Sequence, residues 1–146
     1  MAVLSACQSA ITDAMQLPDE FVGLPAGFLQ AGAAAVIGSL WPVDDVSTAL
    51  LMIECYRWHM RPPSGDPLSP ARALRKAQLS LRDVTAAQLS QLFAAYKKSA
   101  PDAPVNRMAY ATACEQFVNF TLGAARPGDR PFAGAYNWAA FCCYGV

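Results

Sequence analysis

Two short apolar runs enclose a helical pattern in the first 41 residues, and this arrangement limits the fold more than any other feature. Residues 2–6 form a brief run of apolar and small residues, and residues 33–41 (AAAVIGSLW) are too few and too β-branched for an independent helix. Between them, apolar side chains recur at helical spacing over residues 21–29, and Gly32 is suited to end the helix. Strand, helix and strand in this order favour a right-handed crossover between parallel strands. The sequence therefore predicts an α/β fold.

The rest of the chain is mainly helical in pattern. Pro42 interrupts the second strand, and Asp44, Asp45 and Ser47 offer caps for the helix that follows. We expect helices over residues 46–60, 70–84, 85–96 and 106–125 and a last strand over residues 137–146. The prediction is about three strands, two of them parallel and one a final edge strand, with about five helices.

The composition is unusually apolar for a free-standing domain. Hydrophobic residues make up 54% of the 146 residues and charged residues 15%, with a mean hydropathy of +0.21, whereas a charged share of about 25% is usual. This indicates faces that are buried against another segment or partner. With no internal repeat and no long linker, we expect one domain over residues 1–146.

Charge and hydropathy exclude several classes of partner. Lys plus Arg and Asp plus Glu number 11 each, so no long-range field favours nucleic acid. The longest apolar stretch, residues 31–41, is well short of the ~20 residues that cross a bilayer, and no basic segment precedes the first apolar residues as in a secretory signal. We expect no nucleic-acid partner, no membrane association and a cytoplasmic protein.

The five cysteines are an odd set without a CxxC pair, which argues against a disulfide framework and a metal site. Cys55, Cys114, Cys142 and Cys143 are interpreted as small buried apolar residues. No GxGxxG or GxxxxGK motif follows a strand, so a nucleotide-binding domain is disfavoured and no cofactor is expected.

Cys7 differs from the other cysteines because it follows a strand directly, in VLSACQS. Ligands of α/β sheets bind at the carboxyl ends of the strands, where such a residue is presented to the crevice. From this pattern alone a structural cysteine and a nucleophile both stay open.

The order of four motifs resembles the CHAT family, a caspase-like domain often found beside tetratricopeptide repeats. VLSACQS is followed by FVGLPAGFLQAGAAAVIGSLWPVDD, by LSPARALRKAQLSLRDVTAAQL and by YNWAAF. The resemblance covers roughly residues 2–84 and 132–146, departs from the family at Gly134, and leaves a helical insertion over about 88–130. It implies the C-terminal portion of a partial caspase-like α/β/α sandwich with several strands expected upstream.

The resemblance also implies a cysteine endopeptidase. Cys7 matches the family's nucleophile, and Asp45, with Asp44 second, matches an aspartate that accepts an Arg or Lys side chain before the cleaved bond. Trp41 would form an apolar wall of that pocket. The implied partners are a peptide or protein substrate, the upstream half of the same domain and tetratricopeptide repeats.

The activating histidine of the family belongs to a segment before the cysteine, about fifty residues upstream in caspases. The only histidine in this sequence, His59, falls in an expected helix between Trp58 and Met60, and we interpret it as a packing or surface residue. We therefore expect no activity without the upstream segment. The alternative is a non-catalytic interaction module derived from the same fold, which binds partners through an open sheet edge.

Overall fold

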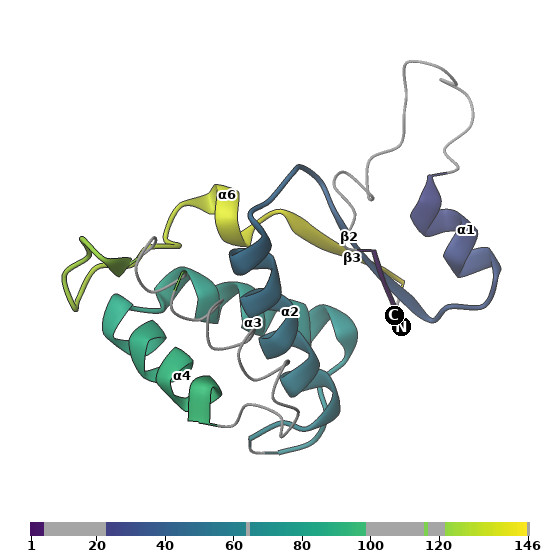
Figure 1. Cartoon of the computed structure of the whole chain (residues 1–146). Coiled ribbons are helices and arrows are strands. Elements are labelled where there is room, and N and C mark those ends of the chain that lie inside the picture. Colours follow the sequence, from purple (N-terminus) through teal and green to yellow (C-terminus); the bar gives the residue numbers. More distant parts are fainter. Residues whose placement is uncertain (5–22, 64, 99–115, 117–121, 146) are drawn as a thin grey trace, which may run out of the picture. The chain divides into compact units, whose positions relative to one another are not determined.

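The computed structural model describes residues 1–4, 23–63, 65–98, 116 and 122–145 (Figure 1). The chain divides into two compact units, one formed by Met1–Arg82 with Gly134–Val146 and the other by Asp83–Ala133. The first unit holds the sheet and every described residue of the candidate site.

The sheet of the first unit has three strands in the order β1-β2-β3. β1 (Ala2–Leu4) runs parallel to β2 (Ala35–Ser39), with Leu4 beside Gly38. β3 (Phe141–Gly145) is antiparallel to β2, with Phe141 beside Ser39. The predicted α/β class, the parallel pair and the final edge strand are confirmed.

The middle strand forms the core of the first unit. All five residues of β2 are buried, which requires cover on both faces of the sheet. Figure 1 shows α1 (Leu24–Gln30) on one side of the strands and α2 (Asp45–Met60) on the other. Gly32, at φ 93°, turns the chain between α1 and β2, as expected for a residue that adopts the left-handed region without a Cβ clash.

Helix α3 (Pro70–Asp83) has one apolar and one charged face. Its buried residues are Ala73, Leu74, Ala77 and Leu81, a helical stripe. Gln78 Nε2 donates a hydrogen bond of 2.8 Å to the backbone oxygen of Phe141 at the start of β3, and Lys76 Nζ lies 4.4 Å from the centre of the Trp58 ring on α2. These contacts fasten α3 to the sheet and to α2.

The predicted last strand over residues 137–146 is wrong in its first part. A short helix, α6 (Ala135–Trp138), precedes β3, and its turns are closed by Asn137 N–H to Gly134 O at 3.0 Å and Ala139 N–H to Ala135 O at 2.9 Å. The aromatic and apolar residues of this run fit a helical turn as well as a strand, so their pattern did not show where the strand begins.

The second unit contains α4 (Ala86–Lys98), which begins at a capping box. Gln88 N–H donates to Thr85 Oγ1 at 3.3 Å, and Thr85 N–H donates to Gln88 Oε1 at 2.9 Å, so two helix-end donors are satisfied reciprocally. Most of the helix expected over 106–125 lies outside the described residues. The insertion over 88–130 within one domain stays a prediction.

Five helices are described in total, as expected. Within the described ranges, no helix combines the length and the apolar character needed to cross a bilayer.

Substitution of Gly145 tests the close packing of β3 against the start of β2. Its φ is +91°, and a Cβ there would come within 3.1 Å of Ala35 Cα and would collide with the Ala34 oxygen. We expect Gly145→Ala to lower the free energy of unfolding by about 2–4 kcal/mol, combining left-handed strain with overpacking. Gly27→Ala on α1, where no atom lies within 4 Å, should leave stability unchanged or raise it by up to about 1 kcal/mol in urea denaturation. Equal effects of the two substitutions would contradict this packing.

Candidate functional site at the carboxyl edge of the parallel strands

The parallel pairing brings the ends of β1 and β2 to the same edge of the sheet. Leu4, the last residue of β1, lies beside Gly38, one residue before the end of β2. After β2 the chain enters the segment that contains Trp41, Asp44 and Asp45. Cys7 follows β1 in the sequence but lies outside the described residues.

The Asp44 carboxylate is hydrogen-bonded to the first backbone N–H groups of α2. Its Oδ2 accepts hydrogen bonds from the backbone N–H groups of Val46 and Ser47, both at 3.0 Å, while the Ser47 hydroxyl donates to the Asp44 backbone oxygen at 3.0 Å. Asp44 is thus the N-cap of α2 and satisfies two donors that the helix leaves unpaired.

Asp45 occupies the first turn of α2 and is exposed. No hydrogen bond or ion pair of its carboxylate is found within the part of the chain that the structure describes. Its negative charge at the positive end of the helix is favourable. The two neighbouring aspartates therefore differ, because one carboxylate is bound to backbone and the other faces solvent.

Trp41 is held in place by the short helix α6. Its Nε1 donates a hydrogen bond of 2.9 Å to the backbone oxygen of Tyr136, and the two rings are stacked with centroids 6.3 Å apart and an interplanar angle of 28°. The Leu40 N–H donates a hydrogen bond of 2.7 Å to the Ala140 oxygen and connects the same two segments. These bonds fix the segment between β2 and α2 against the turn before β3.

Tyr136 is a candidate site residue that the sequence interpretation did not find. It is 58% exposed despite its contact with Trp41, so the aromatic pair presents a polar and apolar surface to solvent. The helix that carries Tyr136 was predicted as strand. The sequence signal that could have pointed to Tyr136 was the aromatic triplet YNW at residues 136–138.

His59 is engaged within the first unit. Its Nδ1 lies 2.8 Å from the backbone oxygen of Leu68, and the Leu68 N–H donates to the Trp58 oxygen at 3.1 Å. The imidazole thus helps to fasten the loop after α2 to the end of that helix.

Two of the described thiols, those of Cys55 and Cys143, are not activated. Burial, with a smaller contribution from the nearby Cys143, raises the pKa of Cys55 to about 11, and Cys55 is only 1% exposed. Burial and the adjacent Cys142 raise the pKa of Cys143. Raised pKa values keep these thiols protonated at neutral pH, and the thiol is a poor nucleophile. Cys114, like Cys7, lies outside the described residues.

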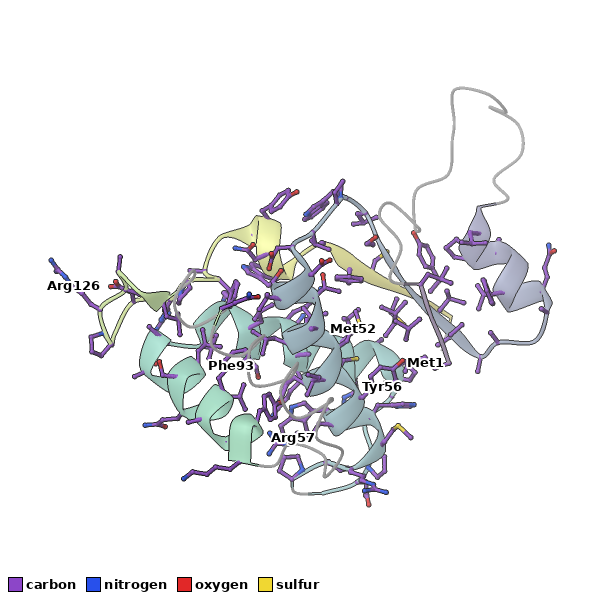
Figure 2. All side chains as sticks on the ribbon, viewed as in Figure 1. Met1, Met52, Tyr56, Arg57, Phe93 and Arg126 are labelled. Atoms are coloured by element: carbon purple, nitrogen blue, oxygen red, sulfur yellow. The ribbon has the colours of Figure 1, made fainter. Side chains whose placement is uncertain are left out.

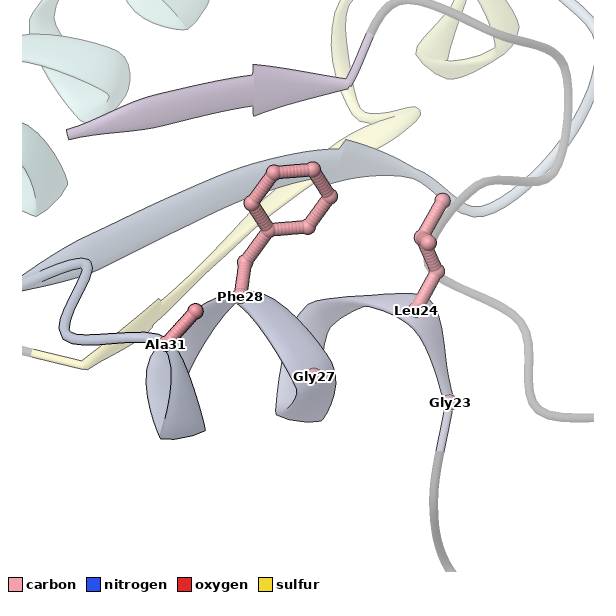
Figure 3. Close-up of a pocket in the computed structure, with 5 residues that line it drawn as sticks. All are labelled: Gly23, Leu24, Gly27, Phe28 and Ala31. Carbon is pink, nitrogen blue, oxygen red and sulfur yellow. The ribbon is translucent and has the colours of Figure 1, made fainter.

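Two other features of the described residues bear on ligand binding. Across the described segments, no group of three or more His, Cys, Asp or Glu side chains is arranged to hold a metal ion. An open apolar hollow runs along α1 and is lined by Gly23, Leu24, Gly27, Phe28 and Ala31 (Figure 3). None of these lining residues belongs to the carboxyl edge described above.

The fold and the edge site define an α/β domain whose parallel strand pair leads into a segment of aromatic and acidic residues. A family model described as CHAT domain matches residues 1–146, and the chain therefore belongs to the CHAT-domain family, which is caspase-like. Neither the search of curated proteins nor the search of solved structures gave a match.

The different roles of Asp44 and Asp45 can be tested by measuring how substitutions of each change the free energy of unfolding. Asp44→Ala removes the N-cap of α2 and should lower the free energy of unfolding by about 1 kcal/mol, within a range of about 0.5–2. Asp45→Ala removes only a charge near the helix end and should cost about 0.3–1 kcal/mol. Asp44→Asn is the control, because asparagine caps as well as aspartate. Urea denaturation measures all three, and a larger loss for Asp45→Ala than for Asp44→Ala would contradict the cap.

Proposed function

We propose that this chain supplies the nucleophile and the basic-residue pocket of a CHAT-family cysteine endopeptidase. The observation that carries the proposal is the parallel pairing of β1 with β2, since it puts the strand that leads to Cys7 and the strand that leads to Asp45 at one edge. Membership of the CHAT-domain family supports the proposal, in which Cys7 of the VLSACQS motif is assigned as the nucleophile because that motif resembles the family's nucleophile motif.

The covalent chain limits how far Cys7 can be from that edge. Cys7 is the third residue after Leu4, and a fully extended chain spans at most about 3.6 Å per residue, or about 11 Å here. This length is compatible with the proposal that Cys7 attacks a substrate bound at the carboxyl ends of the strands.

Asp45 is the residue of the pair suited to bind the substrate's basic side chain. Its carboxylate is exposed and without a described partner, whereas the Asp44 carboxylate already accepts two backbone hydrogen bonds. A guanidinium or ammonium group would form a charge-assisted hydrogen bond with Asp45. Trp41, stacked on Tyr136, would contact the apolar part of an Arg or Lys side chain.

The reaction would follow the usual course of a cysteine peptidase. A base takes the thiol proton, and the Cys7 thiolate attacks the carbonyl carbon of the scissile peptide bond to form a tetrahedral intermediate. The amine departs with a proton from the same base, leaving a thioester on Cys7. Water then hydrolyses the thioester and regenerates the thiol.

The base would come from a histidine outside this chain. His59 is the only histidine in the sequence, and its Nδ1 is engaged with Leu68 at the far end of α2 from the cap. The proposed partner is therefore the histidine-bearing half of the same domain. Without it, the Cys7 thiol would have no base to activate it.

The test uses the chain alone and the chain expressed together with the coding sequence directly upstream. We expect no turnover by the chain alone and cleavage of fluorogenic peptides after Arg or Lys by the joined protein. Asp45→Asn should lower kcat/KM for these peptides about 10- to 100-fold, since a hydrogen bond to a charged group is worth about 1.5–3 kcal/mol. Asp44→Asn carries the same charge change, keeps the cap and should have little effect.

Three outcomes would contradict the proposal. They are turnover by the isolated chain, undiminished cleavage by the joined protein with Cys7→Ala, and no cleavage by a joined protein that is folded. The last result would favour the interaction module, for which the described sheet offers β1 and β3 as its two outer strands.

A further inference from the structure

We propose that a basic surface on α2 and α3 binds a carboxylate-rich segment of another protein. The residues that form this surface, here called the α2–α3 basic surface, are Arg57, Arg61, Arg72, Arg75 and Lys76. All five are exposed and belong to the first unit. The inference does not depend on the proposed peptidase function.

The equal totals of acidic and basic residues conceal a separation of charge along the chain. Between Glu54 and Asp83 the sequence has six Lys and Arg residues and a single acidic residue, Asp66. Since the whole chain has 11 residues of each sign, this stretch carries a net charge of +5 and the rest of the chain −5. A surface of one sign attracts partners of the opposite sign and steers their approach.

Contacts between α2 and α3 make the surface continuous. Lys76 Nζ on α3 lies 4.4 Å from the centre of the Trp58 ring on α2. Trp58 Nε1 donates a hydrogen bond of 2.9 Å to Glu54 Oε1, and the other oxygen of Glu54 forms an ion pair of 3.4 Å with Arg57. Arg57 and Lys76 are therefore connected through Trp58, and the one acidic side chain between them is already engaged.

The other three cations lie within one helical turn of Arg57 or Lys76. Arg61 ends α2 four residues after Arg57, which Figure 2 shows projecting from that helix. On α3, Arg72 precedes Lys76 by four residues and Arg75 by three. Within the described segments, no ion pair or hydrogen bond engages the side chains of Arg61, Arg72 and Arg75. Like charges at this spacing lower helix stability, so a partner's carboxylates would relieve a repulsion within the chain.

The loop between the two helices holds both halves of the surface together. The Leu68 N–H donates to the Trp58 oxygen at 3.1 Å, and His59 Nδ1 lies 2.8 Å from the Leu68 oxygen. Both contacts tie the segment before α3 to the end of α2. The cations are therefore carried by a fixed framework, which reduces the entropy lost on binding.

The composition of the surface favours a protein over a nucleic acid as the partner. Four of its five cations are arginines, whose planar guanidinium groups bind carboxylates through paired hydrogen bonds. Exposed apolar side chains accompany them on the same two helices, with Tyr56 40%, Met60 66% and Leu79 37% exposed. Arg, Tyr and Met are enriched in protein interfaces. Single-stranded nucleic acids instead need a groove of cations that follows the backbone, whereas these cations are confined to a few turns of two helices.

Fluorescence anisotropy with the full 146-residue chain tests the proposal. The probe is a labelled peptide of about 12 residues in which Glu and Asp alternate with Leu and Gly, and the control peptide has Gln and Asn in place of the acids. We expect the acidic peptide to bind with a dissociation constant on the order of 100 µM at low salt. The neutral peptide should bind at least about tenfold more weakly, and salt at about 0.3 M should weaken the acidic peptide several-fold.

Charge reversal tests the location of the surface. Arg72→Glu, and separately Arg75→Glu, should each weaken binding of the acidic peptide at least about fivefold, because an attraction becomes a repulsion. Neither side chain has a bond within the described chain, so both variants should keep the wild-type circular dichroism spectrum. Arg126→Glu is the matched control, since it makes the same change of net charge at an exposed arginine of the second unit (Figure 2). It should bind as the wild type does.

Four outcomes would overturn the proposal. Two of them are equal binding of the acidic and neutral peptides and equal weakening by Arg126→Glu. Tighter binding of a single-stranded oligonucleotide with the same number of negative charges would favour nucleic acid as the partner instead. Salt-sensitive self-association in sedimentation velocity that is lost in Arg72→Glu would favour the acidic residues of a second copy.

Discussion

Parallel hydrogen bonding between β1 and β2, from Ala2 beside Val36 to Leu4 beside Gly38, determines where the chemistry of the first unit can lie. Parallel strands end at the same edge, and ligands of such sheets bind there. The buried residues of β2 anchor this pair between helices on its two faces. The proposed site follows from that pairing, because each strand leads directly into one of its components.

The two neighbouring aspartates at the start of α2 have different surroundings. Asp44 satisfies the first donors of α2, and this fixes the direction in which the helix leaves the sheet edge. Asp45, in the first turn of the same helix, is exposed. The order of these residues explains why the first aspartate is structural while the second is the better candidate for a substrate's positive charge.

The sequence predicted the parts of the fold that depend on local pattern. The crossover, the end of α1 before Gly32 and the start of α2 after Asp44 follow from periodicity and capping chemistry, which act within a few residues. The beginning of β3 and the role of Tyr136 were not predicted, since they depend on contacts between residues 41 and 136, far apart in the chain.

The central claim is that a substrate's basic side chain reaches Asp45 while its carbonyl meets Cys7. A crystal structure of the chain joined to its histidine-bearing segment, trapped with a peptidyl-arginine ketone inhibitor, measures this directly. The account predicts a covalent bond to the Cys7 sulfur and a guanidinium nitrogen about 2.7–2.9 Å from an Asp45 oxygen, with Trp41 against its methylene groups. Attachment to another residue, or a guanidinium bound away from Asp45, would contradict it.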